Sequence, residues 1–120
     1  YAKHPCTIWA MKNKSNMMWL IRHGISMARE KKFRTEKEHF SERFIMWCMF
    51  NMHRSNVPSG SLTEFAVAIN QNQKCRTHPN FENLSVVEKY REYYNYDKSH
   101  FAKWTKRNAP NWYSPAQKAL

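Results

Sequence analysis

The chain contains only two glycines among its 120 residues, and this scarcity is the feature that most limits how it can fold. Sandwiches and barrels with many tight turns need residues that accept positive φ, which glycine does most readily. The same scarcity argues against a glycine-rich phosphate loop of the P-loop or dinucleotide-binding kind. We therefore predict an all-α fold, a compact bundle of four to five helices with one long irregular connection.

Caps and apolar spacing predict where the helices lie. Pro5 suits a first helical turn, Ser15 is the expected cap of the next helix, and Thr35 with Glu38 repeats the spacing of a capping box. Gly24 and Ala28 are small enough for another helix to approach closely. The third helix is apolar nearly all round, so we expect it in the middle of the bundle. The expected helices span residues 6–12, 16–32, 36–52 and 85–106.

The last of these helices carries most of the functional interest. Ser85 and Glu88 form a capping box that marks its start, and Pro110 closes it. Apolar and aromatic residues then recur at steps of three and four, and Asp97 interrupts them. We expect the long helix to pack across the third, with Tyr90, Tyr93, Phe101 and Trp104 inside and Tyr94 and Tyr96 more exposed.

The connections are expected to be irregular. Residues 53–62 form the clearest loop, and residues 70–83 are polar and aperiodic, with Phe81 as an expected anchor to the core. The tail over residues 110–115 carries two aromatic residues, which we expect to pack back on the fold. One domain over residues 1–120 suits this length.

Charge indicates the kind of partner. Twenty Lys and Arg against nine Asp and Glu give a net charge of +11, shared by both halves of the sequence, which favours a nucleic-acid partner. Alternatives are a charge that only maintains solubility, an acidic protein, or a membrane surface. The candidate phosphate- and base-contacting residues are Arg91, Tyr94, Lys98, Lys103, Lys106 and Arg107, with Arg29, Lys31, Lys32 and Arg34 at the end of the second helix. For the second group, a solvated helix end is an equal alternative.

Candidates for chemistry are few. Asp97 is the one catalytic candidate, because partial burial among aromatic rings would raise its pKa, although an ion pair or an exposed position is the simpler reading. His4, Cys6, Cys75 and His78 could supply two His and two Cys to zinc, but their spacing is loose and both His precede prolines. We predict no metal site and no cofactor. No apolar run is long enough to span a bilayer, and three cysteines suit a reducing compartment.

Three sequence pieces resemble a family of small bacteriophage proteins. They are H-P-C-x-x-W-A with N-x-x-W-L (His4, Pro5, Cys6, Trp9, Ala10, Asn16, Trp19, Leu20), P-x-G-x-L-T-x-F (Pro58, Gly60, Leu62, Thr63, Phe65), and Y-R-x-Y-Y, F-A-x-W-T-K-R and P-x-W-Y (Tyr90, Arg91, Tyr93, Tyr94, Phe101, Ala102, Trp104, Thr105, Lys106, Arg107, Pro110, Trp112, Tyr113). The order of elements is loosely similar to phage pyrimidine-dimer DNA glycosylases of the endonuclease V type.

The resemblance implies a basic, helical DNA-repair protein in the cytoplasm of an infected bacterium. In those glycosylases an N-terminal α-amine attacks the damaged nucleoside and a glutamate of the first long helix assists, both within a stretch that would precede His4. Since only Tyr1 to Lys3 precede His4 here, no catalytic residue carries over. Either an N-terminal segment or a protein partner completes an enzyme, or the chain is a non-catalytic nucleic-acid-binding or structural component of a larger phage assembly.

Overall fold

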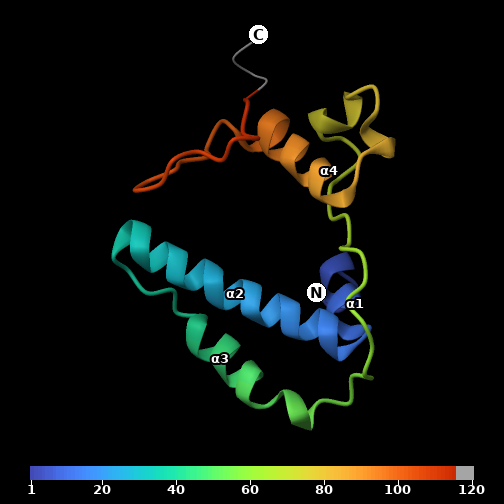
Figure 1. Cartoon of the computed structure of the whole chain (residues 1–120), viewed down its shortest axis with the longest axis vertical. Coiled ribbons are helices and arrows are strands. Elements are labelled where there is room, and N and C mark those ends of the chain that lie inside the picture. Colours follow the sequence, from blue (N-terminus) through green and yellow to red (C-terminus); the bar gives the residue numbers. More distant parts are fainter. Residues whose placement is uncertain (116–120) are drawn as a thin grey trace. The chain divides into compact units, whose positions relative to one another are not determined.

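The computed structural model describes residues 1–115 (Figure 1). Over this range the chain is helical, with four α-helices and no strand, which confirms the all-α prediction. The chain divides into two compact units, Tyr1–Glu64 and Phe65–Leu120. Two such units can be halves of one domain or two small domains, so the single-domain expectation stays a prediction.

The first unit contains three helices, α1 (Pro5–Met11), α2 (Lys14–Thr35) and α3 (Glu42–Phe50). His4 caps α1 by accepting from the Cys6 amide, with Pro5 at the first helical position. Asn13 caps α2 by accepting from the Asn16 amide at 2.9 Å, so the expectation that Ser15 is the cap was wrong. The α2 helix continues beyond its predicted end to Thr35, where Glu36 ends it in a left-handed conformation at φ 61°. Because Thr35 is the last residue of α2, the expected capping box of Thr35 with Glu38 was wrong, and the third helix spans Glu42–Phe50 instead of residues 36–52.

A buried amide joins the start of α2 to the segment after residue 60. Asn16 is fully buried, and its side-chain nitrogen donates to the Trp9 carbonyl at 2.9 Å and to the Thr63 hydroxyl at 2.8 Å. Its oxygen accepts from the Thr63 amide at 3.0 Å. Gly60 packs so closely that an added Cβ would lie 2.9 Å from the Asn13 Cβ. These contacts fix the loop over residues 57–64 against the corner between α1 and α2.

The α3 helix packs on α2 but is not buried. Gly24 allows the approach, since a Cβ there would lie 3.2 Å from Ile45 Cδ1, as the small-residue prediction required. No residue of α3 is fully buried, and Phe44, Trp47 and Phe50 are 69%, 61% and 69% exposed. The expectation of a central third helix was therefore wrong. An all-round apolar pattern reports how much apolar surface a helix has, and not how many neighbours cover it.

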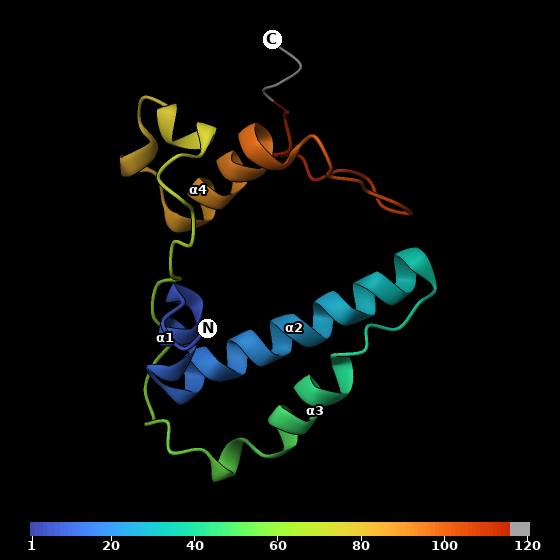
Figure 2. The same ribbon diagram turned by 180° about the vertical axis from the view of Figure 1, so that it is seen from behind.

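The second unit packs around Phe81. An extended segment over residues 65–69 leads into two short 3₁₀ turns, η2 (Lys74–Thr77) and η3 (Phe81–Asn83), which lie beside α4 in both ribbon views (Figures 1 and 2). Ile69, Cys75 and Phe81 are buried together, which confirms Phe81 as the anchor of the irregular connection. Tyr90 holds the extended segment by donating to the Ala66 carbonyl at 2.6 Å and accepting from the Ala68 amide at 2.8 Å.

The α4 helix (Val86–Tyr93) starts as predicted but ends early. The capping box of Ser85 and Glu88 is formed, with both of its hydrogen bonds at 3.2 Å. The helix then widens into one π-helical turn, η4 (Tyr94–Lys98), and residues beyond it are not helical. The predicted continuation of the helix to Lys106 was wrong. Asn95 and Asp97 in η4 instead bind the C-terminal tail and the start of η2. Phe101 is 56% exposed and Tyr96 packs on the core, both contrary to expectation.

The C-terminal tail folds back on this π-helical turn. Asn95 is buried; it accepts from the Ser114 amide at 2.8 Å and donates to the Trp112 carbonyl at 3.4 Å. Tyr113 contacts Trp104 with ring centroids 5.3 Å apart. The expected packing of the tail aromatics is confirmed, and Asn95 within the π-helical turn holds the tail in place.

Candidate nucleic-acid interface

The second unit brings together a cation and two aromatic rings from segments twenty residues apart. The Arg91 guanidinium carbon lies 5.6 Å from the centroid of the Trp112 ring, and Tyr94 meets the same ring edge-on at 6.2 Å. Arg91 is exposed, Tyr94 is 42% exposed and Trp112 is half-buried. A cation over an indole face remains available to an anion at its outer edge, so the group can meet a phosphate and an exposed base together.

Lys98 forms a second contact of the same kind. Its ammonium lies 4.9 Å from the centroid of Tyr93 and 5.3 Å from that of Phe101. Lys98 is half-buried, so its aliphatic stem covers apolar surface while the charge remains near the edge.

Three further predicted cations follow α4 but do not lie on it. Lys103, Lys106 and Arg107 are exposed, and the Arg107 amide donates to the Trp104 carbonyl at 2.9 Å in a tight turn. Lys106 has a left-handed conformation at φ 60°. In place of the predicted helical face, an irregular segment carries Lys103 and a turn carries Lys106 and Arg107. We call Arg91, Lys98, Lys103, Lys106 and Arg107 the C-terminal basic cluster.

The predicted cations at the end of α2 belong to the other unit, and two of them have acidic partners. Lys32 pairs with Glu38 at 3.2 Å on the exposed surface, and Arg34 pairs with Glu30 at 2.8 Å one helical turn away. Arg29 and Lys31 are exposed. This end of α2 thus has lower net charge than its cations alone suggest.

Asp97 is held by backbone amides. Its two carboxylate oxygens accept from the Lys74 amide at 2.7 Å and the Cys75 amide at 3.0 Å. The carboxylate therefore ties η4 to the start of η2. Burial, followed by the hydrogen bond and charge of Asp97, raises the pKa of the Cys75 thiol to about 12, so this thiol stays protonated at neutral pH. This geometry gives Asp97 a structural role in the unit.

The candidate zinc ligands make local turn contacts instead. His4 Nδ1 accepts from the Cys6 amide and His78 Nδ1 accepts from the Asn80 amide at 3.2 Å. His4 and Cys6 belong to the first unit, whereas Cys75 and His78 belong to the second. Over residues 1–115 no three His, Cys, Asp or Glu side chains gather in a way that could hold a metal ion.

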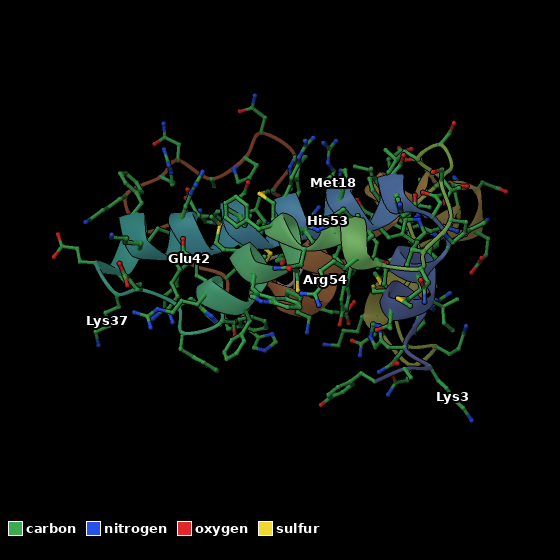
Figure 3. All side chains as sticks on the ribbon, turned by 90° about the horizontal axis from the view of Figure 1, so that it is seen from below. Lys3, Met18, Lys37, Glu42, His53 and Arg54 are labelled. Atoms are coloured by element: carbon green, nitrogen blue, oxygen red, sulfur yellow. The ribbon has the colours of Figure 1, made fainter. Side chains whose placement is uncertain are left out.

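Sequence reasoning missed a groove on the first unit. It has a volume of about 530 Å³ and lies between the first turns of α2, the turn η1 (Met52–Arg54) and the loop that follows. Figure 3 shows Met18 of α2 beside His53 of η1. The sequence did contain a signal for this groove. Lys14, Met18 and Arg22 recur at every fourth residue, as do Ser15 and Trp19, so all five lie on one side of the helix. The lining residues are Lys14, Ser15, Met18, Trp19, Arg22, Met52, His53 and Leu62.

Comparison with known proteins gives no relative from which a function could be carried over. No protein-family model, no curated protein and no solved structure matches this chain. Within the described part of the chain, none of the helices has the combined length and apolar character needed to cross a bilayer.

Proposed function

We propose that this protein binds nucleic acid, DNA in particular, through the C-terminal basic cluster. The observation that carries the proposal is the contact of the exposed Arg91 with the Trp112 ring beside the partly exposed Tyr94. A stacked guanidinium keeps its N–H donors at its rim, where they can take phosphate oxygens in pairs. The chain's net charge of +11 adds long-range attraction to a polyanion.

The cations of the C-terminal basic cluster favour contact with phosphates over recognition of a particular base sequence. Phosphate contacts fix a protein on nucleic acid without base recognition, whereas base recognition needs side chains placed in a groove or against unpaired bases. Lysines outside helices, such as Lys103 and Lys106, suit the first task because their long stems adapt to a flexible backbone. We therefore expect weak dependence of this surface on sequence and strong dependence on salt.

A salt titration tests the proposal. Binding of a labelled 20-base-pair duplex is measured by fluorescence anisotropy between about 50 and 200 mM salt, and affinity should fall steeply over this range. Replacing Lys103, Lys106 and Arg107 by Gln should reduce the slope of log affinity against log salt by up to about 2.7, at about 0.9 per lost contact. The matched control replaces three exposed lysines of the first unit, Lys3, Lys12 and Lys37, by Gln.

Two results would overturn the proposal. If the affinity of the unaltered protein does not fall with salt, phosphates are not its ligands. If the control variant loses as much slope as the cluster variant, general charge accounts for binding and the cluster has no special part. Salt-dependent binding to an acidic protein with none to DNA would favour the alternative, a structural component of a larger assembly.

A glycosylase reaction is a finer proposal, supported by the sequence resemblance alone. Its mechanism implies a covalent imine between an amine of the protein and the deoxyribose. Borohydride reduction of a mixture with abasic or dimer-containing DNA would trap this intermediate. Absence of a covalent adduct under conditions where binding is saturated would contradict the enzymatic function and leave the binding function intact.

A further inference from the structure

We propose that the groove of the first unit takes an unpaired nucleotide of single-stranded nucleic acid, with the base against Trp19 and phosphate on Lys14 or Arg22. The inference rests on the proposed nucleic-acid binding and adds a second contact site in the other unit. The argument comes from three properties of the groove: a held aromatic ring, cations on either side of it, and a loop wall that is tied in place.

The Trp19 ring is held by its neighbours. One face stacks on His23, with ring centroids 4.8 Å apart and planes 16° from parallel, and Trp9 meets it edge-on at 5.8 Å. Trp19 lines the groove, whereas His23 and Trp9 do not. A ring that is already oriented loses little entropy when a planar ligand packs on it. Aromatic side chains accept any base in this way because every base has a π-face.

Cations lie on both sides of this ring. Lys14 and Arg22 are eight residues apart on α2, about 12 Å along the helix axis, and Trp19 lies between them. His53 adds a hydrogen-bonding ring from the opposite wall. Among the described residues that line the groove there is no Asp or Glu. The site therefore favours an anionic ligand whose middle is planar and apolar, which is the chemistry of a nucleotide.

The loop wall of the groove is fixed to the helix. The Lys14 amide donates to the Pro58 carbonyl at 2.8 Å, the Ser15 hydroxyl donates to the Gly60 carbonyl, and Asn13 donates to the Ser61 carbonyl at 2.9 Å. Leu62 of this loop and Met52 of η1 supply apolar contact opposite Trp19. A volume of about 530 Å³ lies in the range of small-molecule sites, which span about 300 to 1,000 Å³.

An unpaired base fits better than a duplex. Bases inside a duplex stack on one another and offer only their edges, whereas bases of a single strand can turn outward onto an aromatic ring. The groove should thus give the protein a preference for single strands that the C-terminal basic cluster alone would not provide.

The first experiment compares a labelled dT20 strand with a 20-base-pair duplex for four variants. Trp19→Leu removes the aromatic face and should lower affinity for dT20 by about 5- to 150-fold, the equivalent of one stacked base. Trp19→Phe keeps an aromatic ring and should retain most of the affinity for dT20 that Trp19→Leu loses. Arg22→Gln should weaken dT20 binding more than the matched charge control Arg43→Gln, an exposed residue of α3 outside the groove. Duplex affinity should fall equally for the two Arg variants.

The second experiment needs no substitution at Trp19. A dT20 strand carrying 5-bromodeoxyuridine is irradiated with the intact protein, and the adduct is mapped after trypsin digestion. Trypsin cuts after Lys14 and Arg22, so the peptide of residues 15–22 isolates Trp19. The adduct should fall on this peptide. An adduct found only elsewhere, or one on this peptide that a peptide ligand but no nucleotide displaces, would overturn the inference.

The outcomes separate the two proposals. If the unaltered protein binds neither strand form, the proposed function fails and the groove inference fails with it. If both forms bind with salt dependence but Trp19→Leu and Arg22→Gln behave like the control, only the groove inference is overturned.

Discussion

Removing the Asp97 carboxylate should destabilise the second unit. Asp97 accepts from two backbone amides at the start of η2, at 2.7 Å from Lys74 and 3.0 Å from Cys75. Hydrogen bonds to a charged acceptor contribute about 1.5 to 3 kcal/mol each, and the Lys74 bond lies at an exposed position where water replaces part of it. We expect Asp97→Ala to lower the free energy of unfolding by about 2 to 4 kcal/mol and Asp97→Asn by about half as much.

Urea denaturation followed by circular dichroism measures this loss. Glu92→Gln is the matched control, because it removes the same charge from α4 at a half-buried position without the amide contacts of Asp97. Asp97→Ala should also lower the pKa of the Cys75 thiol, because the carboxylate's hydrogen bond and charge both help to raise it. Thiol alkylation should consequently become faster in this variant than in the control.

A stable Asp97→Ala protein would refute the reasoning. If its free energy of unfolding lies within about 0.5 kcal/mol of the Glu92→Gln control, the amide contacts do not hold η2 to η4. If the variant is also unchanged in DNA binding but loses a lyase or glycosylase activity of the parent protein, Asp97 belongs to chemistry and its structural assignment is wrong.

Three further predictions concern other buried or titrating groups. Asn16→Ala should cost about 2 to 4 kcal/mol of stability in thermal or urea unfolding, because the three bonds of its buried side chain have no replacement; a change below about 1 kcal/mol would contradict this. Alkylating reagents should label the exposed Cys48 rapidly and Cys75 only after unfolding, as mass spectrometry would show. The hydrogen bonds with Ser85 lower the pKa of Glu88 in the folded state. The stability that the capping box contributes should therefore be fully present above the ordinary glutamate pKa and should decline as pH falls through the lowered pKa. Glu88→Gln should remove this dependence of the free energy of unfolding on acid pH.

Local signals predicted the start of α4 and one point of close approach between helices. The Ser85 and Glu88 capping box forms within four residues of the chain, so no distant partner is needed to decide it. Gly24 likewise marked where α3 would approach α2, because a missing side chain is a property of the position itself. Ser15 was mistaken for a cap because Asn13 offers an equally good acceptor two residues earlier.

The end of the long helix could not be read from its own residues. Phe101 and Trp104 continue the helical spacing after Asp97, yet Asn95 binds the tail and Asp97 binds the η2 amides, so the chain leaves the helix after Lys98. Those partners lie about twenty residues away in the sequence. The cations of the C-terminal basic cluster other than Lys98 are exposed as predicted, but they lose their common helical face.

By itself, the sequence determined the helical class, the starts of α1 and α4 and the excess of positive charge, because each depends on residue type or on neighbours within one turn. Tertiary structure decided that the third helix is exposed, that Asp97 is bound by amides, and that Lys14, Trp19 and Arg22 face η1 across a groove. These outcomes depend on which surfaces meet, and segments far apart in the chain supply the contacts that determine them.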